Sequence, residues 1–551
     1  MYIFFKSLFP ENLKNSLKNI SFVRYIQLFF KIKFSLRKKL KKQLQFKRLP
    51  KEENKFLKKK VFIPLIETSH YQFYQVCVIG KALQLRGAEI KVLICDEFLP
   101  GCEVKSSRNL LKDPCLSCRI NRQNTFPLFG LEYLKISDLF SDQEYSSIKN
   151  DALNIVNNFP ESYEINGIEI INIINDSVTR YFYGEIPTEN SIKLQEVRLK
   201  YAITTLVGFE AAKKISELFN PDIVFGSMEV YADWAPYKKF FTKKGAKFSS
   251  ISMTQFDFNS ILMNQSELFE SKQRYADWLE GRNYAKLNHT EANKLNSFLS
   301  TRFQGNSEVF KKYNYFEKQT NLKEKLKLSK EKKNIFLFSN VFWDIGISDC
   351  GMTYSGVIEW VISTIKIIKE NKNIHLYIKP HPSESFEIKS AGVINAILDE
   401  FSSLPENITI IDPMTKILTY DLFEYIDVGL VFNGTIGLEM ILNDIPVIAC
   451  GKSPYSNLDL VSEPINQEEY EEFLLDHKKT IKPKKDMVEL FAYFYFIKTL
   501  IPWRLNENVY GDDFNGFKID TLEDLLPKAD YFLDHICESI LGSNNKNLDS
   551  W

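Results

Sequence analysis

Short apolar runs alternate with helical patterns in two regions of the chain. Val61–Ile66 is the first apolar run, residues 71–86 follow with helical spacing that stops at Gly87, and Glu89–Cys95 is rich in Ile and Val. Apolar runs of strand length joined by a helix predict a β-α-β unit, the seed of a parallel sheet. The later strands predicted in the two regions are 221–226, Lys247–Met253, Asn334–Ser339, Ile374–Ile378, Ile408–Ile411, Val428–Phe432 and Ile445–Ala449.

The repeated pattern predicts an α/β protein with two Rossmann-like lobes. A polar stretch with a helical period separates the two regions, and the end of the chain is helical and strongly aromatic. Ligands of open α/β sheets bind at the carboxyl ends of the strands, so candidate chemistry is expected there. The predicted division is a basic arm over 1–60, an N-terminal lobe over 61–264, a helical connector over 265–330, a C-terminal lobe over 331–465 and a helical tail over 466–551.

Composition is ordinary, but the charge is unevenly distributed. The chain of 551 residues is 44% hydrophobic and 26% charged, which is typical of a soluble globular protein and excludes collagen, a coiled coil and a wholly disordered chain. Residues 1–60 contain 18 Lys or Arg and 3 Asp or Glu, a net charge of +15, which leaves −14 for the rest. An acidic body with a basic arm is expected to bind anionic surfaces through the arm.

The arm indicates a membrane surface rather than a membrane span. Ile26, Phe29, Phe30 and Phe34 recur at helical spacing with Lys and Arg on other faces, as in an interfacial amphipathic helix. No run of about 20 apolar residues exists, so no transmembrane helix is expected. A solvated basic helix that packs on the acidic body is the alternative. Nucleic acid is not expected, because the remaining chain is acidic, and we predict a cytoplasmic protein on the inner face of the cell membrane.

Two motifs follow predicted strands of the C-terminal lobe. Residues 379–382 read Lys-Pro-His-Pro, so two prolines fix the backbone around His381 while Lys379 adds a cation, an arrangement suited to a phosphate. In the second motif, Asn433 precedes Gly434, which permits close approach of the backbone, and Thr435, which is expected to cap a helix whose free N–H groups bind an anion. A plain turn and an ordinary capped helix are the alternative interpretations.

Further residues around these motifs complete the expected donor site. Glu439 lies about one turn inside the predicted helix, where its carboxylate is placed to accept hydrogen bonds from ribose hydroxyls. Lys452, Ser453 and Tyr455 follow the next strand and are expected to close over the base or the phosphate.

These stretches, Lys379–Pro382 and Asn433–Tyr455, resemble GT-B glycosyltransferases that build bacterial capsular and surface polysaccharides. That group includes the capsular Kdo transferases and, more distantly, polysialyltransferases and teichoic-acid polymerases with a His-Pro motif. The resemblance implies His381 near the nucleotide phosphate and Thr435 and Glu439 on a nucleotide sugar, with CMP- or UDP-linked donors favoured. It also implies an acceptor in the N-terminal lobe, either a surface polysaccharide or a lipid-linked glycan. The N-terminal signatures of Kdo transferases are not clear here, so the donor sugar stays open.

Several acidic or imidazole groups are candidates for the base that deprotonates the acceptor hydroxyl. The sequence does not rank them, and at the first of these positions a helix N-cap by Thr68 or Ser69 is an equal alternative. The candidates are Glu67, His70, Glu229, Asp233 and Asp344, with Asp349 nearby.

Cysteines raise the question of a metal. Cys102, Cys115 and Cys118 are spaced C-x12-C-x2-C, with Cys95 before them, and thiolates at such spacing bind structural zinc. Free, partly buried thiols are the alternative. Without an export signal the compartment is predicted to be reducing, so structural disulfides are not expected. No cofactor is required for the predicted transfer, because Lys, His and a helix dipole can neutralise the leaving phosphate without a metal.

Two other functions fit the same pattern. A nucleotide-sugar epimerase of similar fold would convert its substrate without an acceptor and would have little use for the basic arm. A non-catalytic polysaccharide-assembly protein would bind nucleotide without turnover.

Overall fold

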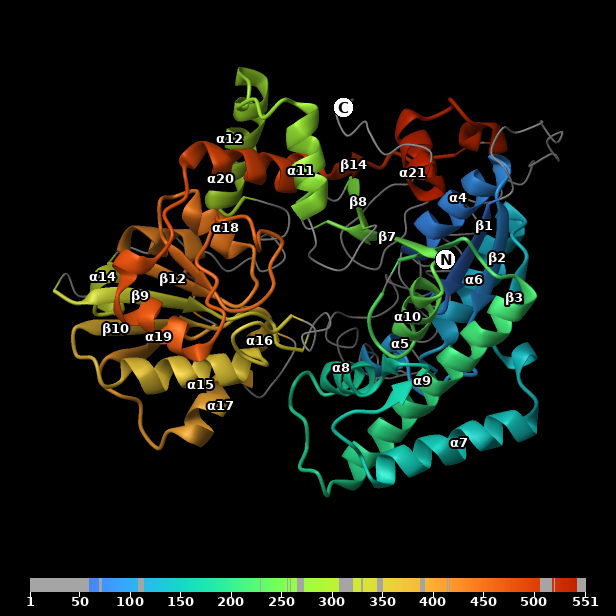
Figure 1. The fold of residues 1–551 in the computed structure, drawn as a ribbon, viewed down its shortest axis with the longest axis horizontal. Helices are drawn as coiled ribbons and strands as arrows, with labels where there is room; N and C mark the ends of the chain where they lie inside the picture. Colours follow the sequence, from blue (N-terminus) through green and yellow to red (C-terminus); the bar gives the residue numbers. More distant parts are fainter. Residues whose placement is uncertain are drawn as a thin grey trace, which may run out of the picture. The chain divides into compact units, whose positions relative to one another are not determined.

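The fold was examined in a computed structural model. It describes residues 59–68, 72–107, 113–227, 229–254, 256–257, 259–264, 272–306, 321–328, 331–343, 350–386, 392–413, 415, 417–505, 518–519 and 521–542. The predictions for the basic arm, His70, Asp344 and Asp349 lie outside these residues. The described residues form two compact units (Figure 1). Unit 1 consists of the described residues within Met1–Phe182, Pro187–Ser266 and Ile501–Asn545. Unit 2 consists of the described residues within Tyr183–Ile186 and Glu267–Leu500.

Unit 1 contains a mostly parallel sheet of seven strands in the order β14-β8-β7-β6-β1-β2-β3. β3, β2, β1, β6 and β7 run parallel and β8 runs antiparallel to β7, so the order of the parallel strands reverses between β1 and β6. This reversal is the switch point at which doubly wound sheets bind ligands. The strands are β1 (Lys60–Leu65), β2 (Glu89–Ile94), β3 (Tyr133–Lys135), β6 (Ile223–Gly226), β7 (Lys247–Met253), β8 (Ser260–Asn264) and β14 (Leu500–Pro502), beside a hairpin of β4 (Glu164–Ile165) and β5 (Ile168–Glu169).

Helices cover both faces of the sheet in unit 1, which explains the continuous apolar run of β1. Phe62 packs on Tyr237 and Phe241 at ring distances of 6.0 and 5.3 Å, while on the other face Gly80 lies so close to Ile63 that an added Cβ would be 3.1 Å from its Cδ1. The helices are α4 (Gln72–Leu85), α5 (Glu103–Ser107), α6 (Leu116–Phe129), α7 (Asp142–Asn157), α8 (Ile171–Tyr181), α9 (Ile192–Leu218), α10 (Ala235–Lys243) and α21 (Tyr531–Leu541), with the 3-10 turns η1 (Ser137–Leu139) and η6 (Leu522–Leu525).

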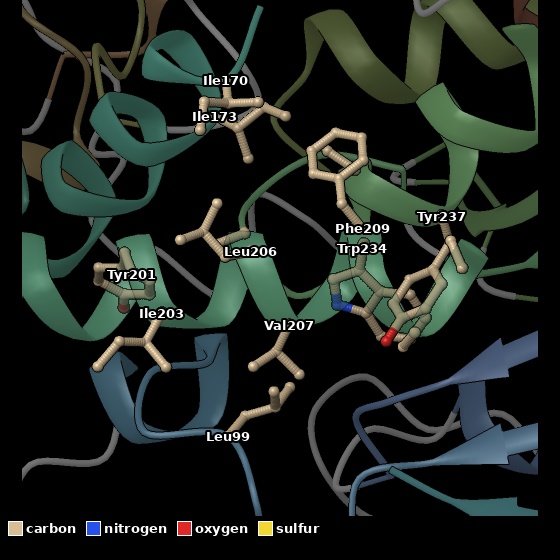
Figure 2. Close-up of a cluster of buried hydrophobic side chains, with 14 of the residues drawn as sticks. Leu99, Ile170, Ile173, Tyr201, Ile203, Leu206, Val207, Phe209, Trp234 and Tyr237 are labelled. Carbon is tan, nitrogen blue, oxygen red and sulfur yellow. The ribbon is translucent and has the colours of Figure 1, made fainter. Parts of the chain in front are cut away.

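The long helix α9 forms the centre of the largest apolar core of unit 1. Figure 2 shows its Leu206, Val207 and Phe209 among side chains from other elements, including Leu99 and Trp234. Among the residues that the structure describes, no helix combines the length and the apolar composition needed to cross a bilayer. The buried side chains of α9 pack in this core along most of the helix.

Unit 2 contains a parallel sheet of five strands in the order β11-β10-β9-β12-β13. The order again reverses once, here between β9 and β12, which places the switch point there. The strands are β9 (Lys333–Phe338), β10 (Ile374–Lys379), β11 (Ile408–Ile410), β12 (Val428–Val431) and β13 (Val447–Ala449). The helices are α11 (Lys272–Gly281), α12 (His289–Phe303), α14 (Leu322–Lys325), α15 (Val357–Ile368), α16 (Ser383–Phe386), α17 (Gly392–Glu400), α18 (Ile436–Ile441), α19 (Gln467–Leu475) and α20 (Lys485–Tyr493), with the turns η3 (Thr419–Tyr425) and η4 (His477–Lys479) and the π-helix η5 (Phe494–Lys498).

One face of the sheet in unit 2 is aromatic and is covered by α18. Phe336 stacks on Tyr377 at 4.6 Å, and Gly429 pairs in register with Phe336 on the other side. A Cβ on Gly429 would lie 2.3 Å from the sulfur of Met440, so glycine allows α18 to approach the sheet closely. The prediction of an α/β protein with two Rossmann-like lobes is confirmed by these two sheets.

The predicted limits of the connector and the tail were wrong. The described residues of the connector lie in unit 2, where Tyr275 and Phe298 pack on Phe491 and Phe496. The tail is divided, because residues beyond 500 join unit 1 through β14 at the sheet edge and through α21 beside α4. Aromatic contacts place the connector in unit 2, whereas strand pairing and helix packing place the end of the chain in unit 1.

Candidate functional site

The loops after β9 and β12 are joined at the switch point of unit 2. Asn340 accepts a hydrogen bond from the backbone N–H of Asn433 at 3.3 Å, and its own amide donates to the Oδ1 of Asn433. A Cβ on Gly434 would lie 3.6 Å from Oδ1 of Asn340, an ordinary contact. The predicted residues Asn433 and Gly434 are therefore positioned at the place where doubly wound sheets bind ligands.

Lys379 ends β10 and supplies an ammonium group with no partner among the described residues. Its side chain alternates onto the face that carries Tyr377, the face covered by α18, and only 4% of the residue is exposed. Burial lowers the pKa of Lys379 to about 8, so the group is still mostly charged at neutral pH. A buried, unpaired ammonium is unfavourable on its own, and it marks a place where an anionic ligand is expected.

His381 adds a hydrogen-bond donor rather than a second positive charge. Its Nδ1 accepts the backbone N–H of Ser383 at 3.1 Å, so the neutral ring carries its hydrogen on Nε2. Within the described part of the chain, Nε2 has no hydrogen-bond partner. Burial, together with the charge of Lys379, lowers the pKa of His381 to about 4, so the expectation that this imidazole neutralises phosphate by charge needs correction.

Glu384, which was not predicted from the sequence, follows His381 in the first turn of α16, and its backbone N–H donates to the carbonyl of His381 at 3.0 Å. Its carboxyl accepts the backbone N–H of Val393 at 3.1 Å and lies 3.5 Å from the Oγ of Ser339. Burial raises the pKa of Glu384 to about 7. An acidic residue three positions after His381 was the available signal, but the sequence gives no indication that it is buried.

The helix after Asn433 is weaker than predicted. α18 contains six residues, and the Thr435 side chain makes no capping hydrogen bond. The predicted anion site at this helix tip is therefore poorly supported, because a short helix has a small dipole. The segment is instead fixed from the loop after β13, where Tyr455 donates a hydrogen bond to the carbonyl of Gly434 at 2.6 Å.

Glu439 is committed to a contact inside unit 2. It is 1% exposed, pairs with the guanidinium of Arg302 on α12, and accepts a hydrogen bond from the Tyr420 hydroxyl at 2.9 Å. This arrangement contradicts the prediction that Glu439 lies on a nucleotide sugar, because Arg302 and Tyr420 already use its two oxygens.

Two other residues predicted for the donor site, Lys452 and Ser453, follow β13, and they differ in exposure. Lys452 is exposed, and its backbone N–H donates to the carbonyl of Cys350 at 2.8 Å. Ser453 is buried and shares a hydrogen bond with the hydroxyl of Ser456 at 3.1 Å. Only Lys452 therefore presents its functional group to solvent.

Carboxyl groups gather at the switch point of unit 1. Glu67 follows β1, and Asp233 follows β6 with 1% of its surface exposed. The Oδ2 of Asp233 accepts the backbone N–H of Glu103 at 3.3 Å, while its Oδ1 is buried without a partner among the described residues. Burial, and then the charge of Glu103, raises the pKa of Asp233 to about 8.

Two carboxyl groups of unit 1, Glu103 and the predicted candidate Glu229, are paired with cations. Glu103 is paired with Arg180 at 2.7 Å, and Glu229 forms an ion pair with Lys238 at 2.5 Å. Asp233 differs from Glu103 and Glu229, because its raised pKa keeps it protonated at neutral pH.

The three cysteines predicted to bind zinc do not come together. Cys102 and Cys118 pack with Val104 in a small apolar cluster, whereas the half-buried Cys115, which precedes α6, lies near Glu97 and Asp113. Burial raises the pKa of all three thiols. All eight cysteines are free thiols.

In the described part of the chain, one group of potential metal ligands lies within 4.8 Å of one another. It combines Cys115 with Glu97 and Asp113. Arg119 pairs with Glu97 at 2.7 Å and with Asp113 at 3.2 Å, so a guanidinium already neutralises these carboxylates.

The two sheets define a protein with two doubly wound α/β units, and the residues at the strand ends of the second form a candidate anion site. Residues 240–496 match the sequence model of the family described as capsule polysaccharide biosynthesis protein. The match covers the whole candidate site of unit 2 and confirms, over these residues, the resemblance to proteins of capsule polysaccharide biosynthesis. Comparison with curated proteins gives no match.

Solved structures share the arrangement only distantly. The β-Kdo 2,7-transferase KpsC of Thermosulfurimonas dismutans is 14% identical with a TM-score of 0.31, over 52% of this chain and 79% of that one. The β-Kdo 2,4-transferase of the same KpsC is 13% identical with a TM-score of 0.33, over 49% of this chain and 78% of that one. The UDP-GlcNAc 2-epimerase of Neisseria meningitidis is 12% identical with a TM-score of 0.22, over 80% of this chain and 99% of that one. Similarities at this level define no reaction, donor or residue role.

Proposed function

We propose that this protein is a glycosyltransferase of capsule polysaccharide biosynthesis that uses a nucleotide-activated sugar. The observation that carries the proposal is the buried, unpaired ammonium of Lys379 beside the Nε2–H donor of His381, at the carboxyl edge of a doubly wound sheet. Sugar nucleotides present phosphate oxygens that need such a cation and such a donor. The family match over residues 240–496 supports a role in capsule synthesis.

In the proposed reaction the bond between the anomeric carbon and the phosphate oxygen breaks, and a bond from the acceptor oxygen to the sugar forms. Negative charge grows on the departing phosphate, where Lys379 and His381 stabilise it. Because the ammonium and the Nε2–H are fixed before the reaction, they stabilise this charge without reorganising. The transfer step requires no metal in this scheme.

The acceptor hydroxyl loses its proton as the new bond forms, and we assign this side of the reaction to unit 1. Asp233 holds a proton at neutral pH and Glu229 is paired with Lys238, so neither is suited to accept one. Among the candidates in the described residues, Glu67 follows β1 at the switch point of unit 1, and we assign proton acceptance to it. Replacing Glu67 with Gln is expected to lower the rate of transfer by about 100-fold or more while donor binding is unchanged.

The basic arm has a separate proposed role, which is to hold the enzyme on an anionic membrane that carries a lipid-linked acceptor. Its charge of +15 supports this role. Full-length protein should sediment with vesicles that contain anionic phospholipid and stay in solution with neutral vesicles. Binding to both, or to neither, would contradict the assignment.

A screen with CMP-, UDP-, GDP- and dTDP-linked sugars tests the main proposal. One nucleotide class should raise the unfolding temperature, since a ligand that binds only the folded state stabilises it. Transfer is then measured with and without a glycan acceptor. Product formed from the nucleotide sugar alone would indicate an epimerase, and binding without any product would indicate an assembly protein.

A matched pair of histidines on β10 and its loop provides the control. His381→Ala should lower turnover by about 100-fold or more, because one preorganised donor to the developing charge is lost. His375, whose Nε2 hydrogen-bonds to Thr409 at 2.8 Å, lies at the other end of the strand. His375→Ala should leave turnover unchanged, and equal losses in the two variants would contradict the assignment of His381.

A further inference from the structure

Three segments around the candidate anion site converge on the carboxyl group of Glu384. One oxygen lies 3.5 Å from the Oγ of Ser339, in the loop after β9, and the other accepts the backbone N–H of Val393, in α17, at 3.1 Å. The backbone N–H of Glu384 donates to the carbonyl of His381 at 3.0 Å, and that of Ser339 donates to the carbonyl of Lys379 at 3.2 Å. The carboxyl therefore joins the loop that carries both anion-binding groups to its neighbours.

The carboxyl has no room to turn away from this position. Glu384 is 3% exposed. A Cβ on Gly392 would lie 2.2 Å from a ring carbon of Phe342 and 3.3 Å from Oε2 of Glu384, so the surroundings are tightly packed. In such a dry environment a charge on the carboxylate acts strongly on its neighbours.

The groups around Glu384 leave its charge without a cation of its own. Ser339 from the loop after β9 and the α17 residues Gly392 and Val393 carry no charge. On its own loop, Lys379 and His381 are the titratable groups, and His381 is neutral at pH 7. Lys379 is the cation that the proposed phosphate needs, so an ionised Glu384 opposes the same anion that Lys379 attracts.

We propose that Glu384 is a positioning residue whose protonation controls how strongly this site holds a phosphate or a similar anion, an inference that rests on the proposed function of the site. As a neutral acid it keeps Ser339 and Val393 in place without repelling the ligand. As a carboxylate it keeps the same contacts but weakens the binding of the anionic ligand. Burial raises the pKa of Glu384 to about 7, within the range in which such control operates. By linkage, a bound anion favours the protonated form.

Sulfate is a suitable probe, because it stays a dianion over the whole range in which Glu384 titrates. Its affinity for the full-length protein would be measured by calorimetry from about pH 6 to about pH 8. Wild-type affinity should fall about fivefold or more over this range. Glu384→Gln should remove most of this fall, because the amide keeps a donor for Ser339 and an acceptor for Val393 without a titrating charge. The pH dependence that remains in this variant is caused by Lys379, which begins to lose its proton near pH 8.

Two further variants separate positioning from charge. Glu384→Ala should lower the affinity for sulfate at every pH, since both side-chain contacts are lost. Glu359, an exposed carboxylate on α15 that accepts the Ser355 backbone N–H at 3.0 Å, provides the matched control. Glu359→Gln should keep the wild-type profile. Equal pH slopes in the wild type and Glu384→Gln would overturn the inference alone, whereas no sulfate binding by the wild type at any pH would overturn the proposed function as well.

Discussion

Replacing Lys379 with Met should make the unliganded protein more stable and abolish its response to anions. Burial lowers the pKa of Lys379 from 10.5 to about 8. A pKa difference of one corresponds to about 1.4 kcal/mol, so keeping this ammonium charged in the folded protein costs about 3 kcal/mol. Methionine has a similar shape and no charge, so Lys379→Met should raise the free energy of unfolding at neutral pH by up to about 3 kcal/mol.

The pH dependence of this gain has a definite sign. Below about pH 8 the lysine is protonated in both the folded and the unfolded protein, so the full penalty is present. Between about pH 8 and about pH 10.5 the folded protein releases the proton first, and the unfolded protein binds more protons. The stability of the wild type therefore rises relative to Lys379→Met through this window, and the difference vanishes above it.

The assay is denaturant unfolding of the full chain with and without sulfate. At a concentration 100 times its Kd, sulfate should stabilise the wild type by about 2.7 kcal/mol and the Lys379→Met variant not at all. Lys333 at the start of β9 is a matched control, because burial also lowers its pKa to about 8 and its Nζ has no hydrogen-bond partner in the described residues. Lys333→Met should keep the sulfate response. A Lys379→Met protein that is less stable than the wild type, or that still responds to sulfate, would refute the reasoning.

Other contacts give further predictions. A Cβ on Gly437 would lie 2.2 Å from the hydroxyl of Tyr455, so Gly437→Ala should destabilise the protein by about 1–3 kcal/mol in denaturant unfolding, and an unchanged midpoint would contradict this packing. Because the pKa of Asp233 is raised to about 8, wild-type stability should fall as the pH rises from about 4 to about 8, and Asp233→Asn should remove most of that fall in a pH series. Arg302→Ala leaves the buried Glu439 unpaired and should cost about 3–5 kcal/mol, whereas replacing both residues with apolar ones should cost less, which a double-mutant cycle measures.

Much of the fold was predictable because parallel strands in doubly wound sheets are continuous apolar runs. The runs at Val61–Ile66 and Val428–Phe432 correspond to β1 and β12 within one residue at each end. The short edge strand β14 was not predictable, because three residues carry no periodic signal. The division of the tail also depends on contacts between distant residues, which a local pattern does not contain.

Residues of the candidate site were predictable where their place at the end of a strand decides their role. They were not predictable where the role depends on contacts with residues distant in the sequence. Lys379 and His381 follow a strand directly, so the strand itself places them at the ligand-binding edge. Glu439 was assigned to a ligand because Arg302, 137 residues earlier in the chain, is invisible to a local motif. Glu384 was missed for the opposite reason, since its importance comes from burial against segments that lie apart in sequence.

The five parallel strands have the same order in the two units, but the charged groups beside the two switch points differ. Beside the switch point of unit 1, the chain places carboxyl groups, with Asp233 holding a proton and Glu103 paired with Arg180. Beside that of unit 2, it places Lys379 without a counterion among the described residues. Carboxyl groups exchange protons with hydroxyl groups, and an unpaired ammonium attracts phosphate. The proposed glycosyl transfer needs both tasks. In the proposal Glu67 of unit 1 accepts the proton of the acceptor, and Lys379 and His381 of unit 2 stabilise the departing nucleotide, so each task is assigned to residues at the strand ends of one unit.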